Sequence, residues 1–369
     1  MIQDARFTPP SGQNLRWRVV GSGPVALALV ALAVRQGMAP GRIWLDPAPA
    51  EARPLPEALA ARAIALSQGS AQLLSRVITL PAAGRIEQVE VSMRGQAGRT
   101  RIEAREFGVP DLGRVVRYGA LIQALRNAVG GLALACEGPV DVIIHAEGDP
   151  GDDAHIRRFG QSALLGEVRA YAARPETTHT AFERFTPAGP LALLPLPEPG
   201  RYSLVWCDTP EACEARRQAP LETLTQTLCE RFGAALGPLQ PEGPFSVYPL
   251  ERRARRTLVS GREVWIGNAA QALHPVAGQG LNLGLRDAFE LARALCRSAQ
   301  AATGVEQTLA RWARSRRADR RLTLTLTDLM AASFTWPLAR PLQSPMLTAL
   351  DLIPALRRPL ARHLMFGLR

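Results

Sequence analysis

The chain has 369 residues, 47% of them apolar, and a net charge of +11 that is carried almost wholly by arginine. This composition excludes a disordered protein and is typical of two or three domains that share a sizeable core. The charge suits an anionic cofactor, an anionic membrane or simply a solvated basic surface. An aromatic content of 5% and the lack of a basic–aromatic repeat argue against a nucleic-acid partner.

Targeting and redox signals predict a cytoplasmic protein. The five cysteines form no CxxC pair and have no histidine at zinc-ligand spacing, which predicts reduced thiols and no metal site. Residues 1–18 lack an apolar signal core. No uncharged stretch reaches the roughly 20 apolar residues that a membrane span needs.

The amino-terminal elements predict a strand–helix–strand unit. A polar leader, residues 1–14, is expected to be disordered. Residues 17–20 then predict a strand, and residues 26–35, rich in Ala and Leu, predict a buried helix. Residues 42–46 predict a second strand that ends in Asp46, so the chain opens on a βαβ unit.

The middle of the chain alternates between helices and short strands. We expect a helix over residues 60–77, strands within 85–107, and a strand that passes into a helix over 114–130. A strand over 140–148 and several strands between residues 162 and 206 follow.

The last part of the chain predicts mainly helices. Residues 220–236 and 281–299 each show helical periodicity. After residue 305 the chain is expected to be mostly helical, with several proline breaks.

A glycine-rich turn lies between the first predicted strand and helix. Gly21, Gly23 and Ala26 match GxGxx(G/A). In a dinucleotide fold the first glycine permits the tight turn, the second lets backbone approach a pyrophosphate, and the small third residue lets helix pack on strand. Asp46 at the end of the next strand would bond a ribose hydroxyl. This pattern predicts a site for NAD(P) or FAD.

A second glycine-rich run, GNAAQALHPVAGQGLNLGLRD, covers residues 267–287. Its last part predicts an inward-packed helix, whose free N–H groups and positive dipole end would face a group that is or becomes negative. A flavin ring gains negative charge at its N1–C2=O edge on reduction. The run therefore favours FAD over NAD(P).

These residues resemble a known family. The run 267–287 is similar to the second FAD motif of the para-hydroxybenzoate-hydroxylase-like flavoprotein monooxygenases, and most resembles the ring hydroxylases of ubiquinone biosynthesis. Three further stretches carry this resemblance: ARAIALSQGSAQLL (61–74), FGQSALLGEV (159–168), and FERFTPAGPLALLPL (182–196) followed by SLVWC (203–207).

The resemblance implies an α/β fold in which a Rossmann-like FAD-binding domain is interleaved with a mixed or antiparallel substrate sheet, with a helical C-terminus. The FAD-binding domain is expected in three pieces, residues 15–84, 108–158 and 251–300. The substrate sheet would take residues 85–107 and 159–250, and the C-terminal helical region residues 301–369.

The resemblance also implies the cofactor contacts. Gly21, Gly23 and Ala26 would face the pyrophosphate and Asp46 the adenosine ribose. The other implied contacts are Arg62 and Arg117 near the cofactor, Glu147 and Gly148 of the middle motif, Asn268 at the ribityl chain, Pro275 against the ring, and the backbone of Gly278, Gly280, Leu281 and Asn282 at the isoalloxazine. His274 is interpreted as a positioning residue, and no catalytic residue is assigned.

The implied reaction inserts one oxygen atom of O2 into a polyprenylated phenol through a flavin C4a-hydroperoxide, with NAD(P)H or another donor as transient reductant. Asn268 and Gln271 resemble the subgroup that hydroxylates 2-polyprenyl-6-methoxyphenol; most relatives have Asp and His there. Residues 347–369 mix Leu with Arg and predict either peripheral contact with the inner face of the cytoplasmic membrane or a helical lid.

Two departures leave alternatives open. Ala146-Glu147-Gly148 stands where the family has ADG, and the DPGDDAH that follows lacks the family's serine. Only ACEGPVD (135–141) remains of the expected upstream hairpin. A weak or inactive paralogue that binds lipid or partner proteins in a biosynthetic complex, and a flavin reductase on the same fold, are therefore the alternatives to the hydroxylase.

Overall fold

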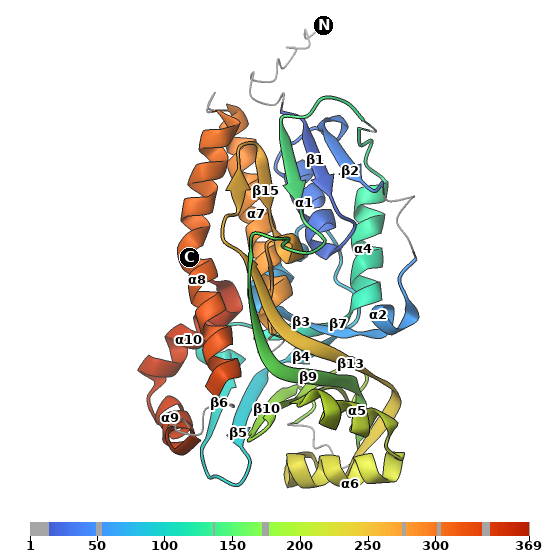
Figure 1. The fold of residues 1–369 in the computed structure, drawn as a ribbon, viewed down its shortest axis with the longest axis vertical. Coiled ribbons are helices and arrows are strands. Elements are labelled where there is room, and N and C mark those ends of the chain that lie inside the picture. The colour runs from blue at the N-terminus through green and yellow to red at the C-terminus, as the bar shows by residue number, and fades with distance from the viewer. Residues whose placement is uncertain are drawn as a thin grey trace, which may run out of the picture.

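The computed structural model describes residues 15–48, 54–135, 137–171, 177–274, 278–300, 304–333 and 340–368. The predicted leader (1–14) and Pro275 lie outside these ranges. A five-stranded sheet with its helices forms the upper half of the molecule in Figure 1, and a larger eight-stranded sheet forms the lower half.

The upper sheet has the strand order β14-β15-β8-β1-β2. Its central strands β1 (Trp17–Val20), β2 (Ile43–Asp46) and β8 (Val142–His145) run parallel, as does β15 (Glu263–Trp265) beside β8. The two-residue β14 (Val259–Ser260) pairs antiparallel at the edge. The predicted βαβ opening is confirmed.

Helix α1 (Pro24–Arg35) connects β1 to β2 and has no polar face, because every residue from Pro24 to Ala33 is buried. It packs against α7 (Gln279–Gln300) and α4 (Tyr118–Gly130), so three helices cover the sheet. Small and apolar side chains are what such a sandwiched helix needs.

The helix predicted over residues 60–77 is wrong. The structure has a one-turn helix α2 (Glu57–Ala61), a strand β3 (Ala63–Ser67) and a second helix α3 (Gln68–Leu74). Strand β3 pairs antiparallel with β7 (Gly113–Arg117), which also pairs with β4 (Ala83–Ile86). Because short apolar runs fit helix and strand alike, this distant pairing decides the outcome. The strand and helix predicted over 114–130 are confirmed as β7 and α4.

The lower sheet has the order β16-β13-β9-β12-β11-β10-β5-β6. Its strands are β5 (Gln88–Met93), β6 (Arg99–Glu103), β9 (Ala154–Ala170), β10 (Thr180–Thr186), β11 (Gly189–Pro195), β12 (Arg201–Asp208), β13 (Leu239–Arg255) and β16 (Gln271–Ala272). The strands predicted within 85–107 and 162–206 are confirmed.

One face of this sheet is covered by α5 (Pro210–Gln218) and α6 (Leu221–Phe232). The helix predicted to 236 therefore ends at Phe232, where Gly233 with φ +86° leaves helical conformation. Strands β9 and β13 have 17 residues each and pair along most of their length, crossing the domain borders expected at residues 158/159 and 250/251. Figure 1 shows them rising from the lower sheet beside α7 and α8.

From residue 279 onward the described chain is mainly helical as predicted, with α7 followed by α8 (Val305–Ser333), α9 (Arg340–Leu352) and α10 (Pro354–Phe366). A buried ion-pair network joins α7 to α8: Arg316 Nε donates to Asp287 Oδ1 over 2.7 Å and Arg286 Nε to Asp319 Oδ2 over 3.1 Å. Within the described ranges, no helix has the length and apolar character needed to cross a bilayer.

Candidate functional site

The turn Gly21–Gly23 lies where β1 ends and α1 begins. Gly21 has φ +130°, and its N–H donates to the carbonyl of Asp46 over 2.7 Å, which joins the turn to the end of β2. A side chain at Gly21 would place its Cβ 2.6 Å from the Cβ of Glu147. The glycine is therefore needed both for its conformation and for the close approach of the segment after β8.

Four motif segments converge behind this turn. The side chain of Val25, in the first turn of α1, lies within about 3 Å of positions where Cβ atoms of Gly267 and Gly284 would stand. The carbonyl of Ala146 lies 3.0 Å from that same position on Gly267. Gly21, Gly267 and Gly284 thus let the first motif, the 267–274 segment and α7 approach one another and the Ala146–Glu147 segment closely.

The carboxylate of Glu147 sits on the N-terminal end of α1. Its Oε2 accepts hydrogen bonds from the backbone N–H of Ser22, from the N–H of Gly23 over 3.1 Å, and from the Ser22 hydroxyl over 3.3 Å. These N–H groups belong to Gly23, the N-cap of the 12-residue helix α1, and to the residue before it, and we call them the α1 donors because they lie at the positive end of its dipole. The turn therefore holds an anion, and that anion is the chain's own.

The expected ribose acceptor is also engaged within the chain. The Asp46 carboxylate accepts from Arg18 through Nη2 and, over 3.2 Å, through Nε. The Arg18 guanidinium in turn lies over the ring of Trp44 at 4.3 Å. Both partners of this ion pair are 35% exposed, so solvent screens it.

Arg62 and Arg117 lie at the junction of the upper and lower halves. The Arg62 guanidinium lies 5.3 Å from the centre of the Tyr248 ring on β13. Arg117 pairs with Glu167 of β9, with Nη2 3.1 Å from Oε2, and donates to the carbonyl of Ala61 over 3.0 Å. The hydrogen bond to Glu167 raises the pKa of Arg117 above its ordinary value.

Within residues 267–274, one amide side chain is exposed and another is buried. Asn268 is exposed within a short 3₁₀ turn, Gly267–Ala269. Gln271 is 1% exposed and bridges two charges: it donates to Asp287 Oδ2 over 3.1 Å and accepts from Arg320 Nε over 2.7 Å. His274 is buried with Phe159 edge-on to its ring, and burial lowers the pKa of His274 to about 4.

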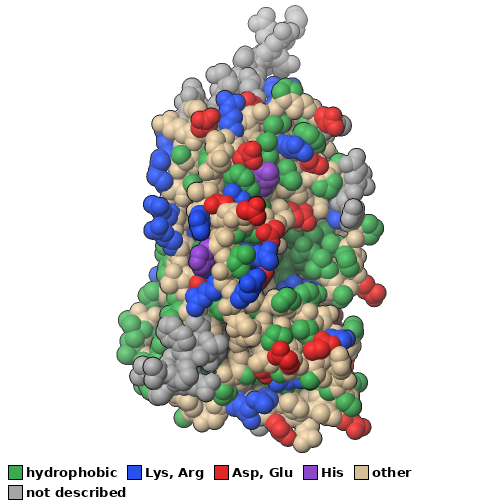
Figure 2. Space-filling view, in the orientation of Figure 1, with side chains coloured by type: hydrophobic (Ala, Val, Ile, Leu, Met, Phe, Trp, Pro, Cys, Tyr) green, Lys and Arg blue, Asp and Glu red, His purple; other side chains and the backbone are tan. Residues whose placement is uncertain are grey.

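The turn that begins α7 is fastened to β3 by one side chain. Asn282, 2% exposed, accepts from the Ser67 N–H over 2.9 Å and donates to the carbonyls of Ala65 over 3.1 Å and Gly278 over 2.7 Å. Gly278 has φ +58° and lies against Ala65. Gly278, Gly280 and Leu281 remain half-buried and accessible. Figure 2 shows a recess lined by apolar side chains in the middle of this face, between α4 and the long strands β9 and β13.

Comparison with known proteins finds similarity to an FAD-binding domain and to hydroxylases. A family model described as an FAD binding domain matches residues 148–324. The chain is 37% identical over 181 residues to the ubiquinone hydroxylase UbiL of Rhodospirillum rubrum, which covers 48% of this chain and 41% of UbiL. It is 32% identical over 187 residues to the 3-demethoxyubiquinol 3-hydroxylase of Escherichia coli, covering 50% and 46%.

About half of this chain is therefore similar to proteins named as ubiquinone hydroxylases. Each of those two alignments spans less than half of the relative's own length. An uncharacterized Synechocystis protein aligns over 77% of both chains at 27% identity.

Solved structures agree on the fold. PqsL of Pseudomonas aeruginosa, a probable FAD-dependent monooxygenase, superposes with a TM-score of 0.70 over 87% of this chain and 96% of its own, at 17% identity. The flavin-dependent brominase Bmp2 gives 0.71 over 95% and 93%, at 13% identity. The predicted fold class is confirmed.

A half-buried carboxylate on β10 was missed in the sequence. Glu183 shares a row of the lower sheet with Ala192, Val205 and Leu165, on the face turned away from α5 and α6. Neighbours of that row form a small apolar cluster around Ala163, Cys207 and Leu250. Among the described residues nothing bonds to its carboxylate, and burial raises the pKa of Glu183 to about 7. Only the strand register reveals this, since Glu183 looks like an ordinary polar position of an alternating strand.

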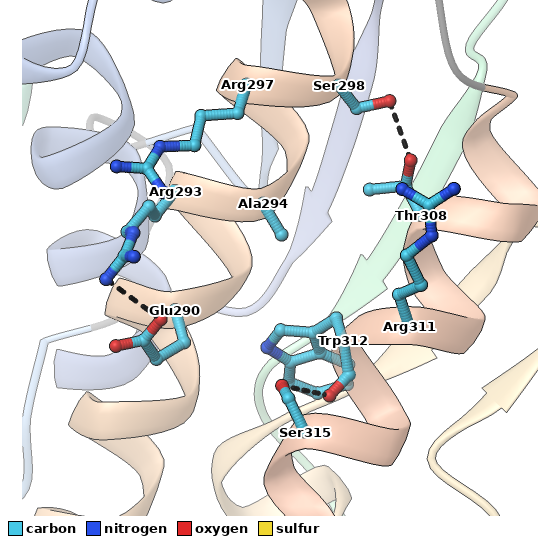
Figure 3. A pocket seen from close by; sticks show the side chains of 9 residues that line it. All are labelled: Glu290, Arg293, Ala294, Arg297, Ser298, Thr308, Arg311, Trp312 and Ser315. Carbon is cyan, nitrogen blue, oxygen red and sulfur yellow. Dashed lines mark hydrogen bonds and ion pairs between the residues drawn. The ribbon is translucent and has the colours of Figure 1, made fainter. Parts of the chain in front are cut away.

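A second pocket, about 390 Å³, lies between the C-terminal half of α7 and the start of α8 (Figure 3). Arg293, Arg297 and Arg311 line it, and the Thr308 hydroxyl donates to Ser298 Oγ over 2.7 Å at its edge. From Leu281 to Arg297 the helix rises roughly 24 Å. This basic pocket is therefore remote from the Gly278–Asn282 turn.

Proposed function

We propose that the chain is an FAD-dependent aromatic hydroxylase that inserts one oxygen atom of O2 into a polyprenylated phenol of ubiquinone biosynthesis. The observation that carries this proposal is the convergence of the first motif, the Ala146–Glu147 segment, Gly267 and α7 at a turn whose backbone N–H groups hold an anion. Bound FAD would supply the activation of oxygen, with NAD(P)H or another donor as reductant. The similarity to ubiquinone hydroxylases supports the choice of substrate class.

The residues present fit this cofactor. The N–H groups of Ser22 and Gly23, which hold a carboxylate, have the donor geometry that a diphosphate needs at a helix N-terminus. Asp46 at the end of β2 would accept from a ribose hydroxyl. Arg62 and Arg117 lie at the junction beside this groove, and the exposed amide of Asn268 is free of a fixed role in the core.

The start of α7 would hold the flavin ring. Gly278 precedes a 22-residue helix, and Gly280, Leu281 and Asn282 lie in its first turn, where the N–H groups lack intrahelical partners. Their fixed dipoles would stabilise negative charge on the reduced ring without adding a full charge. Asn282 fixes this turn on β3 in advance, so the donors are preorganised.

The apolar face of the lower sheet would hold the phenol. The row Ala192, Val205 and Leu165 offers an apolar wall, and Glu183 on the same row offers a proton acceptor. A phenol attacks an electrophilic oxygen better as a phenolate, so Glu183 would take up the phenolic proton.

Two exposed C-terminal helices would contact the membrane that contains the prenyl chain. Leu352, Ile353 and Leu356 are 74%, 45% and 54% exposed at the junction of α9 and α10, and Arg358 and Arg362 are exposed on α10. Figure 2 shows apolar side chains grouped at the lower left, where these helices lie in Figure 1. Apolar side chains flanked by arginine suit an anionic bilayer surface.

Labelled oxygen tests the proposed reaction. The purified chain, supplied with FAD, NAD(P)H and a short-chain 2-polyprenyl-6-methoxyphenol, is expected to place one ¹⁸O atom from ¹⁸O2 in the ring, detected by mass spectrometry. Flavin absorbance without label in the ring would support the reductase instead. A colourless protein that takes up no added FAD would refute the proposed hydroxylase activity.

Glu183→Gln tests the proton acceptor in the same assay. Wild-type kcat/KM is expected to rise as the pH increases through about 7, where the carboxylate ionises. The variant is expected to lose that rise and about 100-fold in rate. Glu167→Gln, on β9 beside Arg117, is the control for simple loss of a carboxylate at the junction. An unchanged pH profile in Glu183→Gln would remove the residue from the mechanism.

Vesicle binding tests the membrane surface. The pair Leu352→Ser and Leu356→Ser is expected to weaken sedimentation with anionic phosphatidylglycerol vesicles about tenfold, because each change removes apolar area. Leu221→Ser is the matched control, since Leu221 is 55% exposed on α6, away from α9 and α10. If wild type and the Leu352→Ser, Leu356→Ser variant bind vesicles equally, or if wild type does not bind, the two helices form a lid without membrane contact.

A further inference from the structure

Glu147 occupies the place where the proposed function needs a phosphate. Its single oxygen Oε2 receives the N–H groups of Ser22 and Gly23 together with the Ser22 hydroxyl. These are the donors that a diphosphate at this turn would use, and the Cβ of Glu147 lies so close to Gly21 that only a glycine fits. Two anions cannot share one set of donors, because their charges repel at contact distance.

The geometry of the middle motif explains why this residue reaches the turn. Strand β8 ends at His145, next to β1 in the sheet, and the carbonyl of Val20 accepts from the Ala146 N–H over 2.9 Å. The next residue therefore stands directly beside the end of β1. A glutamate there is long enough to place its carboxylate on the axis of α1, whereas aspartate is one methylene shorter.

We propose that Glu147 is an internal anion that closes the Gly21–Gly23 turn in the cofactor-free protein, so that FAD binds only by displacing it. This inference rests on the proposed function, since it concerns the same cofactor site. The Glu147 carboxylate satisfies the α1 donors when FAD is absent and must swing out when the diphosphate enters. The chain thus binds FAD more weakly than its glycine turn alone would permit.

The neighbouring acid adds to the same effect. Asp46 is held by Arg18, so the ribose also meets an acceptor that is already paired. The turn N–H groups are therefore paired with Glu147 and the Asp46 carboxylate with Arg18, both within the chain. FAD has to exchange partners at the diphosphate and at the ribose.

Substitution of Glu147 shows whether this residue competes with FAD for the turn or helps to bind FAD. Glu147→Gln keeps the shape and removes the charge, and Glu147→Ala removes the acceptor. We expect both to lower the Kd for FAD, measured by quenching of flavin fluorescence, by about tenfold to a hundredfold, the range of a lost charge-assisted contact. If Glu147 instead holds the cofactor, both variants bind FAD more weakly, which overturns the proposal.

Asp149→Asn is the matched control. It removes one negative charge two residues away from Glu147, and its carboxylate bonds Gly151 and Arg253 without touching the turn. We expect its Kd for FAD to stay within about twofold of wild type. An equal gain in affinity in Asp149→Asn would assign the effect to net charge and overturn the proposal.

Melting temperatures without FAD give a second readout. Glu147→Ala leaves the α1 donors without an acceptor and is expected to melt lower than wild type, although it binds FAD more tightly. Inorganic pyrophosphate is expected to raise the melting temperature of Glu147→Ala and to leave wild type nearly unchanged.

These readouts distinguish the two failures. Wild type and variants that bind FAD with equal Kd would refute the role of Glu147 and leave the hydroxylase intact. Proteins that bind no FAD, while pyrophosphate stabilises only Glu147→Ala, would refute the hydroxylase and keep the internal anion. If no protein binds FAD and pyrophosphate stabilises none of them, the hydroxylase and the internal anion are both refuted.

Discussion

The two ends of the candidate cofactor groove are built from different chemistry. At the nucleotide end, glycine backbone and α1 donors are held by charged side chains, Glu147 on the turn and Arg18 on Asp46. At the flavin end, a neutral amide, Asn282, ties the start of α7 to β3 through three hydrogen bonds. One end is closed by groups that a ligand must displace, whereas the other is preformed and keeps its donors accessible.

The difference teaches where the sensitivity of such a site lies. A fully satisfied buried amide fixes geometry at small electrostatic cost, so the flavin end is stable whether or not a ligand is present. Charged contacts near solvent are weaker and exchangeable. Changes at the flavin end should therefore alter folding, and changes at the nucleotide end should alter binding.

The largest effect is expected for Asn282→Ala. The substitution leaves the Ser67 N–H without its acceptor in a buried position and detaches β3 from α7, which we expect to lower the free energy of unfolding by about 2–4 kcal/mol. Urea denaturation monitored by circular dichroism measures it. The exposed Asn268→Ala is the control and should stay within about 0.5 kcal/mol. A loss under about 1 kcal/mol at Asn282 would contradict the preformed flavin end.

An effect of intermediate size on the free energy of unfolding is expected when the pH is lowered. Because the pKa of His274 is lowered to about 4 by burial, the unfolded chain binds a proton that the folded chain refuses between its ordinary pKa near 6.5 and about 4. Stability at the flavin end is therefore lost as the pH falls through this window, by roughly 2–3 kcal/mol.

The measurement compares unfolding free energies at pH 7 and pH 4.5. Relative to wild type, His274→Gln should remove the His274 contribution to the difference between pH 7 and pH 4.5, while His155→Gln, at an exposed position, should leave the wild-type difference unchanged. Glu183, whose raised pKa contributes with the opposite sign in this window, is present in all three proteins, so only the difference between them is compared. If the two variants have the same slope, His274 is not the group that titrates.

The smallest effect on stability is expected for Asp46→Asn. The Arg18–Asp46 pair is 35% exposed on both sides, so its removal should change the free energy of unfolding by less than about 1 kcal/mol. The same variant should raise the Kd for FAD about tenfold, because a ribose hydroxyl loses a charged acceptor. A large loss of stability with unchanged FAD affinity would reverse the roles that we assign to the two ends.

Local patterns in the sequence predicted the parts of this groove that depend on neighbouring residues. The glycine turn, α1 and β2 follow one another within 30 residues, and their residue types define each element. The start of α7 was predicted for the same reason. Strand β3 was mistaken for helix because its partner β7 lies about 50 residues further along the chain.

Contacts between distant segments could not be read from the sequence. Glu147 bonds a turn 125 positions away, so its pattern signalled a departure from ADG but not where the carboxylate would go. Glu183 acquires its raised pKa from the strands beside it and from burial within the sheet. Gln271 similarly looked like a marker of substrate subgroup, whereas its amide bridges Asp287 and Arg320.

The paired strands β9 and β13 determine how the groove can open. At about 3.3 Å per residue, each 17-residue strand spans roughly 56 Å, and hydrogen bonds along most of that length make the pair a stiff ribbon. A ribbon that rises from the lower sheet beside α7 and α8 would resist a hinge rotation of one half against the other. We therefore expect a dinucleotide to enter by side-chain rearrangement at the rim, with a rate set by rotamer exchange rather than by domain motion.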